Sequence, residues 1–136
     1  MRWLGRSCVL AVVMVAALFG VTAQAQAAVP PQNVGWLYTL SGSGAVYFDA
    51  DLAGHPGWEK ITVCDNSPDG RGIYASVEAY EDGVGWVSES ILDQSYDRHC
   101  ESMQGNYFND GFYVWVQICE YWGHNFDNCA EGKGVA

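Results

Sequence analysis

The run from Asp65 to Gly70 holds the residue types closest to metal chemistry. It reads Asp-Asn-Ser-Pro-Asp-Gly, with oxygen-bearing side chains at the first, third and fifth positions and glycine at the sixth. An EF-hand calcium loop begins in this way but needs a bidentate Glu at its twelfth position, where Ser76 stands. Asp and Gly are also what a tight turn requires, because they tolerate positive φ and bond their own backbone. We therefore predict a turn with no metal and no cofactor, and keep Asp65 and Asp69 only as alternative metal ligands.

A second metal-like pattern is Cys119-x4-His124-x4-Cys129, which matches the second half of a zinc knuckle. The leading pair of cysteines is missing, since Cys100 lies 19 positions upstream. In an exported chain, thiolates are oxidised to disulfides. Of the three possible pairings of the cysteines after residue 27, we prefer Cys64–Cys100 with Cys119–Cys129, because the second bridge would tether a short loop rich in Gly and Asn.

Residues for nucleophilic catalysis are not arranged in any familiar motif. The chain contains neither Gly-x-Ser-x-Gly nor His-Glu-x-x-His. The three histidines lie in turns or beside cysteines, and we interpret them as surface residues: His55, His99 and His124. The 16 acidic residues could include a glycosidase-like pair, but a sequence does not give the separation of two carboxylates. We expect no catalytic residues and no enzymatic activity.

Aromatic residues are the most suggestive feature for function. Alternation places Tyr113, Trp115 and Tyr121 on one side of a single predicted strand. Exposed rings beside carboxylates could stack against sugars, as in carbohydrate-binding β-sandwiches, whereas the same rings could instead cover a thin core. The candidate binding surface comprises Tyr113, Trp115, Tyr121 and Trp122.

The first 27 residues have the pattern of a signal peptide. Arg2 and Arg6 precede an uncharged run over 9–21, and small residues allow cleavage after Ala27 or, alternatively, after Ala25. The apolar run of 13 residues is shorter than the roughly 20 that a membrane-spanning helix needs. We predict a secreted, extracellular protein with no membrane attachment after cleavage.

The chain that remains after cleavage is strongly acidic. It has 109 of the 136 residues, all 16 acidic ones and four of the six basic ones, which gives a formal charge of −12. Such a surface repels nucleic acids and anionic lipids. The expected partner is an extracellular protein or a polysaccharide.

Alternating apolar residues and Gly-rich turns predict short strands and no helix. Expected strands cover Gly35–Leu40, Ala45–Asp51, both arms of a hairpin over Glu59–Tyr80, Trp86–Leu92 and Phe112–Tyr121. We expect a flexible leader at 28–33, mostly loop over Asp93–Gly111, a bridged loop over Gly123–Cys129 and a frayed tail over Glu131–Ala136. The predicted fold is all-β: a small antiparallel immunoglobulin-like sandwich of residues 34–136 with two disulfides.

Three segments resemble a large group of small exported actinobacterial proteins of unknown function. They are Gly44–Phe48, Gly57–Asp65 and Asp69–Ala75, which together give a Gly-Glu-x-φ-x-φ-x-Asp strand and an Asp-Gly hairpin, except that Trp58 separates Gly from Glu. The resemblance implies a secreted disulfide-bonded β-sandwich. A second resemblance, through Tyr47-x4-Leu52-x-Gly54, is to the βγ-crystallin strand motif and provides the alternative fold.

These observations lead to three functional hypotheses. The leading one is a non-enzymatic domain that binds an extracellular or envelope macromolecule through its surface. The first alternative is a carbohydrate-binding module that uses exposed aromatic residues. The second is an inhibitor or toxin that acts through the Cys119–Cys129 loop.

Overall fold

Eight β-strands build the protein in the computed structural model, which describes residues 29–97 and 99–136. The strands are β1 Val34–Tyr38, β2 Gly44–Asp49, β3 Glu59–Asp65, β4 Gly72–Glu81, β5 Gly85–Asp93, β6 Cys100–Gly105, β7 Tyr113–Trp122 and β8 Asn125–Val135. The described residues contain no helix, and so no helix there is long and apolar enough to cross a membrane. The expected signal peptide at 1–27 lies outside the described residues.

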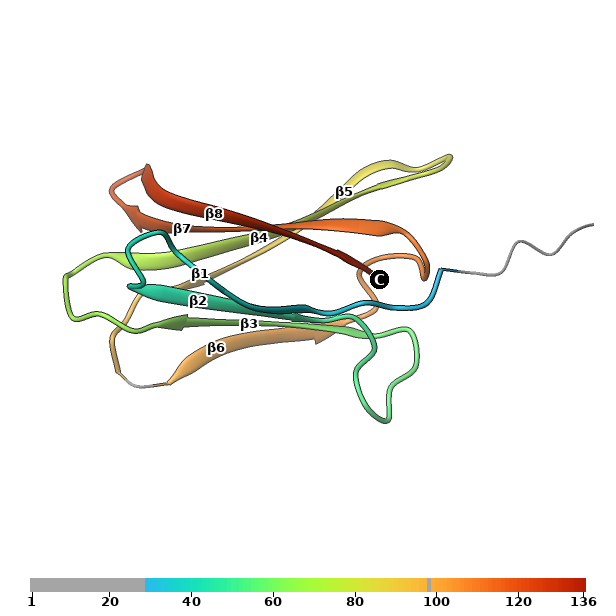
Figure 1. Cartoon of the computed structure of the whole chain (residues 1–136), viewed down its shortest axis with the longest axis horizontal. Helices are drawn as coiled ribbons and strands as arrows, with labels where there is room; N and C mark the ends of the chain where they lie inside the picture. The colour runs from blue at the N-terminus through green and yellow to red at the C-terminus, as the bar shows by residue number, and fades with distance from the viewer. Residues whose placement is uncertain (1–28, 98) are drawn as a thin grey trace, which may run out of the picture.

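The strands form two antiparallel four-stranded sheets that stack face to face (Figure 1). One sheet has the order β1-β2-β3-β6 and the other the order β5-β4-β7-β8. Along one side the sheets are joined through the backbone, because Gln32 and Val135 exchange two hydrogen bonds of 2.9 and 3.0 Å, and Leu40 N donates to Asn128 O at 2.9 Å. The all-β sandwich predicted from the sequence is confirmed.

The core lies between the sheets and consists of the apolar residues that alternate along the central strands. The first sheet contributes Val46, Phe48, Ile61 and Val63, and the second contributes Ala75, Val77, Ala79, Val114, Val116 and Ile118, all fully buried. Burying one side chain of the size of Val or Ile stabilises the fold by roughly 1.5–3 kcal/mol. Gly44 lets β2 approach closely, since a Cβ there would collide with the side chain of Ile73.

The prediction of a hairpin over Glu59–Tyr80 is wrong. β3 pairs with β2 and β6, whereas β4 pairs with β5 and β7, so the Pro-Asp-Gly segment crosses from one sheet to the other. The apolar faces of the two strands do meet, but they face each other across the core. Alternation with a period of two is the same in both arrangements, because it reports which face is buried and not which strand lies alongside.

Two strands lie where none was predicted. The Asp93–Gly111 segment is mostly loop, as predicted, but it also contains β6. β8 takes the place of most of the predicted bridged loop over Gly123–Cys129 and of the predicted frayed tail, with Val135 and Ala136 buried. Both are edge strands that pair with a single neighbour, β6 with β3 and β8 with β7. Edge strands expose most of their side chains, so their sequences lack the apolar alternation that marks a central strand.

The two disulfides pair as predicted, Cys64 with Cys100 and Cys119 with Cys129. Each ties an edge strand to its neighbour: the first joins β6 to β3, and the second joins β8 to β7. Two disulfides in so small a domain indicate an oxidising, extracellular environment.

Candidate functional site

The outward side of the sheet β5-β4-β7-β8, here called the aromatic face, gathers most of the exposed rings of that sheet. Strand register builds it in rows across all four strands, because residues opposite one another in antiparallel strands point to the same side. The row nearest the β4–β5 turn starts with Trp86 opposite Tyr80, and a second row runs Ser88, Glu78, Trp115, Lys133.

Four rings at this end form the tryptophan cluster: Tyr80, Trp86, Tyr113 and Trp115. Their exposed fractions are 53, 66, 50 and 42%, respectively. Ring centroids lie 5.6 Å apart for Tyr80–Trp86 and 5.9 Å apart for Trp86–Trp115, so the rings are in contact across three strands. The cluster is therefore a continuous exposed surface and not part of the core.

Lys133 is the cation on this end of the face. Its Nζ lies 4.0 Å from the centroid of the Tyr113 ring and 5.3 Å from that of Trp115. These are cation–π distances. One face of Tyr113 is thus covered by the protein's own ammonium group, whereas Trp86 is the most exposed ring of the cluster.

Polar side chains fill the middle of the face. A row in register runs Ser90, Ser76, Gln117, Glu131 from β5 to β8, and Gln117 donates to Glu131 at 3.2 Å. Ser76, Gln117 and Glu131 line a shallow hollow of about 220 Å³ beside Trp115. This strip offers hydroxyl, amide and carboxylate groups for hydrogen bonds between two aromatic regions.

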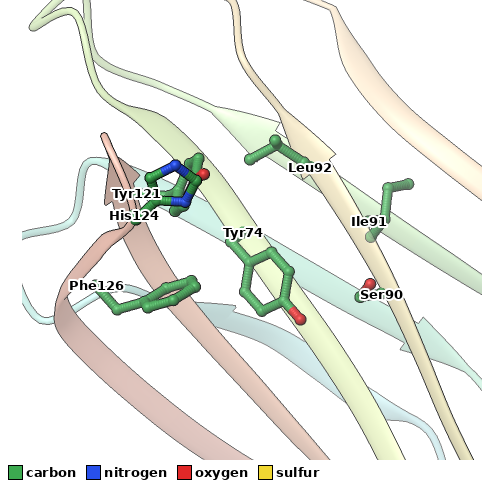
Figure 2. A pocket seen from close by; sticks show the side chains of 7 residues that line it. All are labelled: Tyr74, Ser90, Ile91, Leu92, Tyr121, His124 and Phe126. Carbon is green, nitrogen blue, oxygen red and sulfur yellow. The ribbon is translucent and has the colours of Figure 1, made fainter.

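The far end of the face holds a second cavity, here called the tyrosine pocket (Figure 2). Its volume is about 390 Å³, and its lining is Tyr74, Ser90, Ile91, Leu92, Tyr121, His124 and Phe126. Phe126 packs against both tyrosines, with ring centroids 5.2 Å from Tyr74 and 5.3 Å from Tyr121. Four strands and one turn thus contribute to a single hollow.

A β-bulge in β8 makes this pocket possible. The register shifts between Ile118 and Glu120, so that β8 has one extra residue there, and Asn128 in this stretch has φ 49°. An extra residue reverses the side to which the following side chains point. Phe126 therefore lies opposite Tyr121 on the outward side, where uninterrupted alternation would turn it inward.

His124 forms the tip of the pocket in the β7–β8 turn. Gly123 and His124 are the two central residues between the paired residues Trp122 and Asn125, with φ of 52° and 72°. Two positive φ values are typical of the type I′ turns that close two-residue hairpins. The segment predicted as a projecting bridged loop is thus a tight hairpin.

The four residues predicted as a binding surface do not form one continuous surface. Tyr113 and Trp115 belong to the tryptophan cluster, and Tyr121 lines the tyrosine pocket. Trp122 follows Tyr121 and points to the opposite side of β7, where the Arg71 guanidinium lies 4.1 Å above its ring.

Sequence reasoning missed the rings that neighbouring strands contribute: Tyr74, Tyr80, Trp86 and Phe126. Alternation in β4 already places Tyr74 and Tyr80 on the side opposite the core, but which strands flank β4 depends on pairing that one sequence does not give. Phe126 was missed because the bulge changes the side to which its side chain points. The residue that could have indicated the bulge is Asn128, since Asn tolerates positive φ.

The two alternative metal ligands hold turns together. An Asp65 oxygen accepts a hydrogen bond from Ser67 N at 3.0 Å, and an Asp69 oxygen accepts one from Arg71 N at 2.9 Å. These are bonds of an Asp side chain to the backbone two residues on. Within residues 29–97 and 99–136, no three His, Cys, Asp or Glu residues come together as a metal site.

Besides Asp65, four carboxylates are buried outside the aromatic face, and each connects distant parts of the chain, three of them through backbone N–H groups. Glu59 accepts from Tyr107 N at 2.8 Å, Glu81 accepts from Asn109 N at 2.7 Å, and Asp93 accepts from Asp65 N at 2.9 Å. Burial raises the pKa of Glu59, an effect that the backbone N–H groups of Tyr107 and Phe108 reduce without cancelling. The Oε1 atom of Glu59 has no hydrogen-bond partner among the described residues.

Glu120 is the fourth buried carboxylate and the best satisfied. Its oxygens accept hydrogen bonds from Ser41, from Ser43 at 2.6 Å and from Asn128 at 3.0 Å, and they pair with Arg71. Burial alone would raise the pKa of Glu120, but these donors lower it to about 2. Glu120 therefore stays ionised and connects the β7–β8 bulge to the β1–β2 turn.

Comparison with protein-family models, with curated proteins and with solved structures finds no match to this chain.

Proposed function

We propose that the protein is a secreted, non-catalytic binding domain that holds a neutral polysaccharide chain across its aromatic face. The observation that carries this proposal is the layout of that face: exposed rings at one end, a polar strip in the middle and a ring-lined pocket at the other end.

The chemistry of the face suits sugars. The C–H side of a sugar ring packs against aromatic faces, and its hydroxyls need donors and acceptors, which the Ser76, Gln117 and Glu131 strip provides. Strands and a disulfide hold these groups in place before binding, which reduces the entropy lost on association.

The length of the aromatic face and the net charge of the protein limit the class of ligand further. Tyr113 and Tyr121 are eight residues apart on one strand, a span of about 26 Å at about 3.3 Å per residue. Such a span suits an oligomeric chain better than a single sugar. A formal charge of −10 for the whole chain disfavours anionic polysaccharides, nucleic acids and anionic lipids.

Secretion is part of the proposal and is supported by the signal-peptide pattern and the two disulfides. The inhibitor hypothesis depended on a projecting loop between Cys119 and Cys129. Since that segment is a tight hairpin, we do not propose it.

Retention on insoluble polymers tests the proposal. The protein would be mixed with cellulose, chitin, xylan and starch granules, and the unbound fraction measured. We expect retention on at least one polymer and a roughly tenfold weaker affinity for Trp86→Ala and Trp115→Ala, as for exposed aromatic anchors.

Trp36→Ala is the matched control, because Trp36 is 49% exposed and packs against Tyr47 on the other sheet. It should bind like the unmodified protein. No retention on any polymer, or an equal loss in Trp36→Ala, would show the proposal to be wrong.

A further inference from the structure

The tyrosine pocket differs in chemistry from the rest of the aromatic face. Its walls are three rings and the Leu92 side chain, while the Ile91 side chain packs against the core on the other side of the sheet. Its polar groups, besides the tyrosine hydroxyls, are the Ser90 hydroxyl and the His124 imidazole. None of the residues that line it is Asp, Glu, Lys or Arg. At about 390 Å³ it is within the range of small-molecule pockets, roughly 300–1,000 Å³.

Such a lining selects against an unsubstituted sugar. A plain hexose carries hydroxyls around its whole rim, and several of them would lie against Leu92 and Phe126 without a partner. Burying a polar group without a hydrogen bond is unfavourable. A ligand for this pocket therefore needs an apolar group together with one compact polar group.

We propose that the tyrosine pocket takes the acetamido group of a sugar, so that the ligand is an N-acetylated polysaccharide. This inference rests on the proposed function and names its substrate class. The acetamido methyl supplies the apolar part for Leu92 and the rings. The amide supplies one donor and one acceptor. Ser90 and His124 lie on opposite sides of the Tyr74 ring (Figure 2), so the acetamido groups of two sugar residues of the chain would be needed to reach both. The amide carries no charge, which suits a pocket lined by no Asp, Glu, Lys or Arg.

The backbone at His124 supports a role for its side chain. Its φ of 72° lies in the left-handed region, where non-glycine residues are strained and glycine is not. A glycine would close this turn more easily, yet an imidazole that lines the pocket stands there. The same geometry supplies a clean variant, since His124→Gly removes the imidazole without opposing the turn.

Titration calorimetry with two soluble probes, chitotriose and cellotriose, tests the pocket separately from polymer retention. They differ in the acetamido groups that only chitotriose carries. We expect chitotriose to bind at least tenfold more tightly than cellotriose. Ser90→Ala and His124→Gly should each weaken chitotriose binding by roughly threefold to tenfold, the effect of one lost hydrogen bond.

Ser102→Ala is the matched control, an exposed serine on the edge strand of the other sheet, and it should leave the affinity unchanged. Thermal melts of all variants show whether a loss of binding reflects a loss of fold, and His124→Gly should melt no lower than the unmodified protein.

The outcomes separate the two proposals. One outcome is retention on polymers that depends on Trp86, together with equal affinity for both trisaccharides. It would support polysaccharide binding by the aromatic face and would contradict the acetamido pocket. Chitotriose binding without polymer retention would support the pocket and overturn the extended face. If N-acetyl-tyrosine amide binds and chitotriose does not, the pocket takes an aromatic peptide side chain and the sugar inference is wrong.

Discussion

The side-chain amide of Asn128 donates a hydrogen bond of 3.0 Å to Glu120, and the backbone of Asn128 has a φ of 49°. The residue thus satisfies a buried carboxylate and forms part of the bulge that turns Phe126 outward. One side chain therefore connects the interior of the sandwich to the wall of its tyrosine pocket.

Substitutions at Asn128 separate these two roles. Asn128→Gly keeps the positive φ but loses the hydrogen bond, and we expect it to lower the free energy of unfolding by about 1 kcal/mol. Asn128→Ala loses both and should cost roughly 2–3 kcal/mol, because alanine is strained at this φ. Urea unfolding gives both values, and equal effects of the two substitutions would contradict the role assigned to the bulge.

Glu120 should make the fold sensitive to acid. Its pKa is about 2 in the folded protein and near 4.5 when unfolded, so its contribution is complete above about pH 4.5. As the pH falls from 4.5 towards 2, the unfolded chain takes up the proton first, and stability on the order of 3 kcal/mol is lost. Glu120→Gln should be less stable than the unmodified protein at pH 7. In thermal melts, the difference between their melting temperatures should become smaller as the pH falls from 4.5 towards 2. A constant difference from pH 7 to pH 2 would refute this role of Glu120.

Glu59 should have the opposite dependence. Burial raises the pKa of Glu59 above 4.5 in the folded protein, so the folded chain holds this proton to higher pH than the unfolded chain does. Its contribution is complete below pH 4.5 and is lost as the pH rises through the raised pKa. Glu59→Gln cannot ionise, so we expect its stability relative to the unmodified protein to increase as the pH rises from 4 to 7.

Glu59→Ala is the control for this measurement. It removes the acceptor for Tyr107 N and should destabilise the fold at every pH. A Glu59→Gln curve parallel to that of the unmodified protein would contradict the raised pKa.

The two disulfides should differ in their contributions. Cys64–Cys100 closes a separation of 36 residues and Cys119–Cys129 one of 10. On the chain-entropy model, removing them as Ser pairs should cost about 4 and about 3 kcal/mol, respectively. Guanidinium unfolding of the two double variants shows which disulfide contributes more to the free energy of unfolding. A larger loss of stability for the shorter loop would show that the disulfides act mainly through native contacts and not through the entropy of the unfolded chain.

Much of the sandwich could be predicted from residues that bury one face. Every second side chain of a central strand points into the core, as Val46 and Phe48 do in β2 and Val114 and Val116 in β7. This alternation in the sequence was enough to predict both strands. The cysteine pairing was also predicted, from loop composition. The partners of β3 and β4 were not, because Ile61 alternates in the same way whether Ile73 lies beside it or across the core.

Only part of the aromatic face could be predicted from the sequence, for the same reason. Tyr113 and Trp115 share one strand, so alternation alone brings them together. Trp86 joins Trp115 through β4, which requires the register of three strands, and Phe126 requires a bulge set by a single asparagine. Long-range pairing and local backbone irregularities are properties of the folded chain as a whole.

The bridge between Gln32 and Val135 has a consequence for how the molecule assembles. It joins residues more than 100 positions apart, and the sheets also pair strands distant in sequence, β3 with β6 and β4 with β7. Loop closure of this length costs entropy before its contacts form, so folding should take milliseconds to seconds rather than microseconds. The side of the sandwich that Gln32 closes cannot form until Val135 has been synthesised, so Gln32 waits for more than 100 further residues before it can pair.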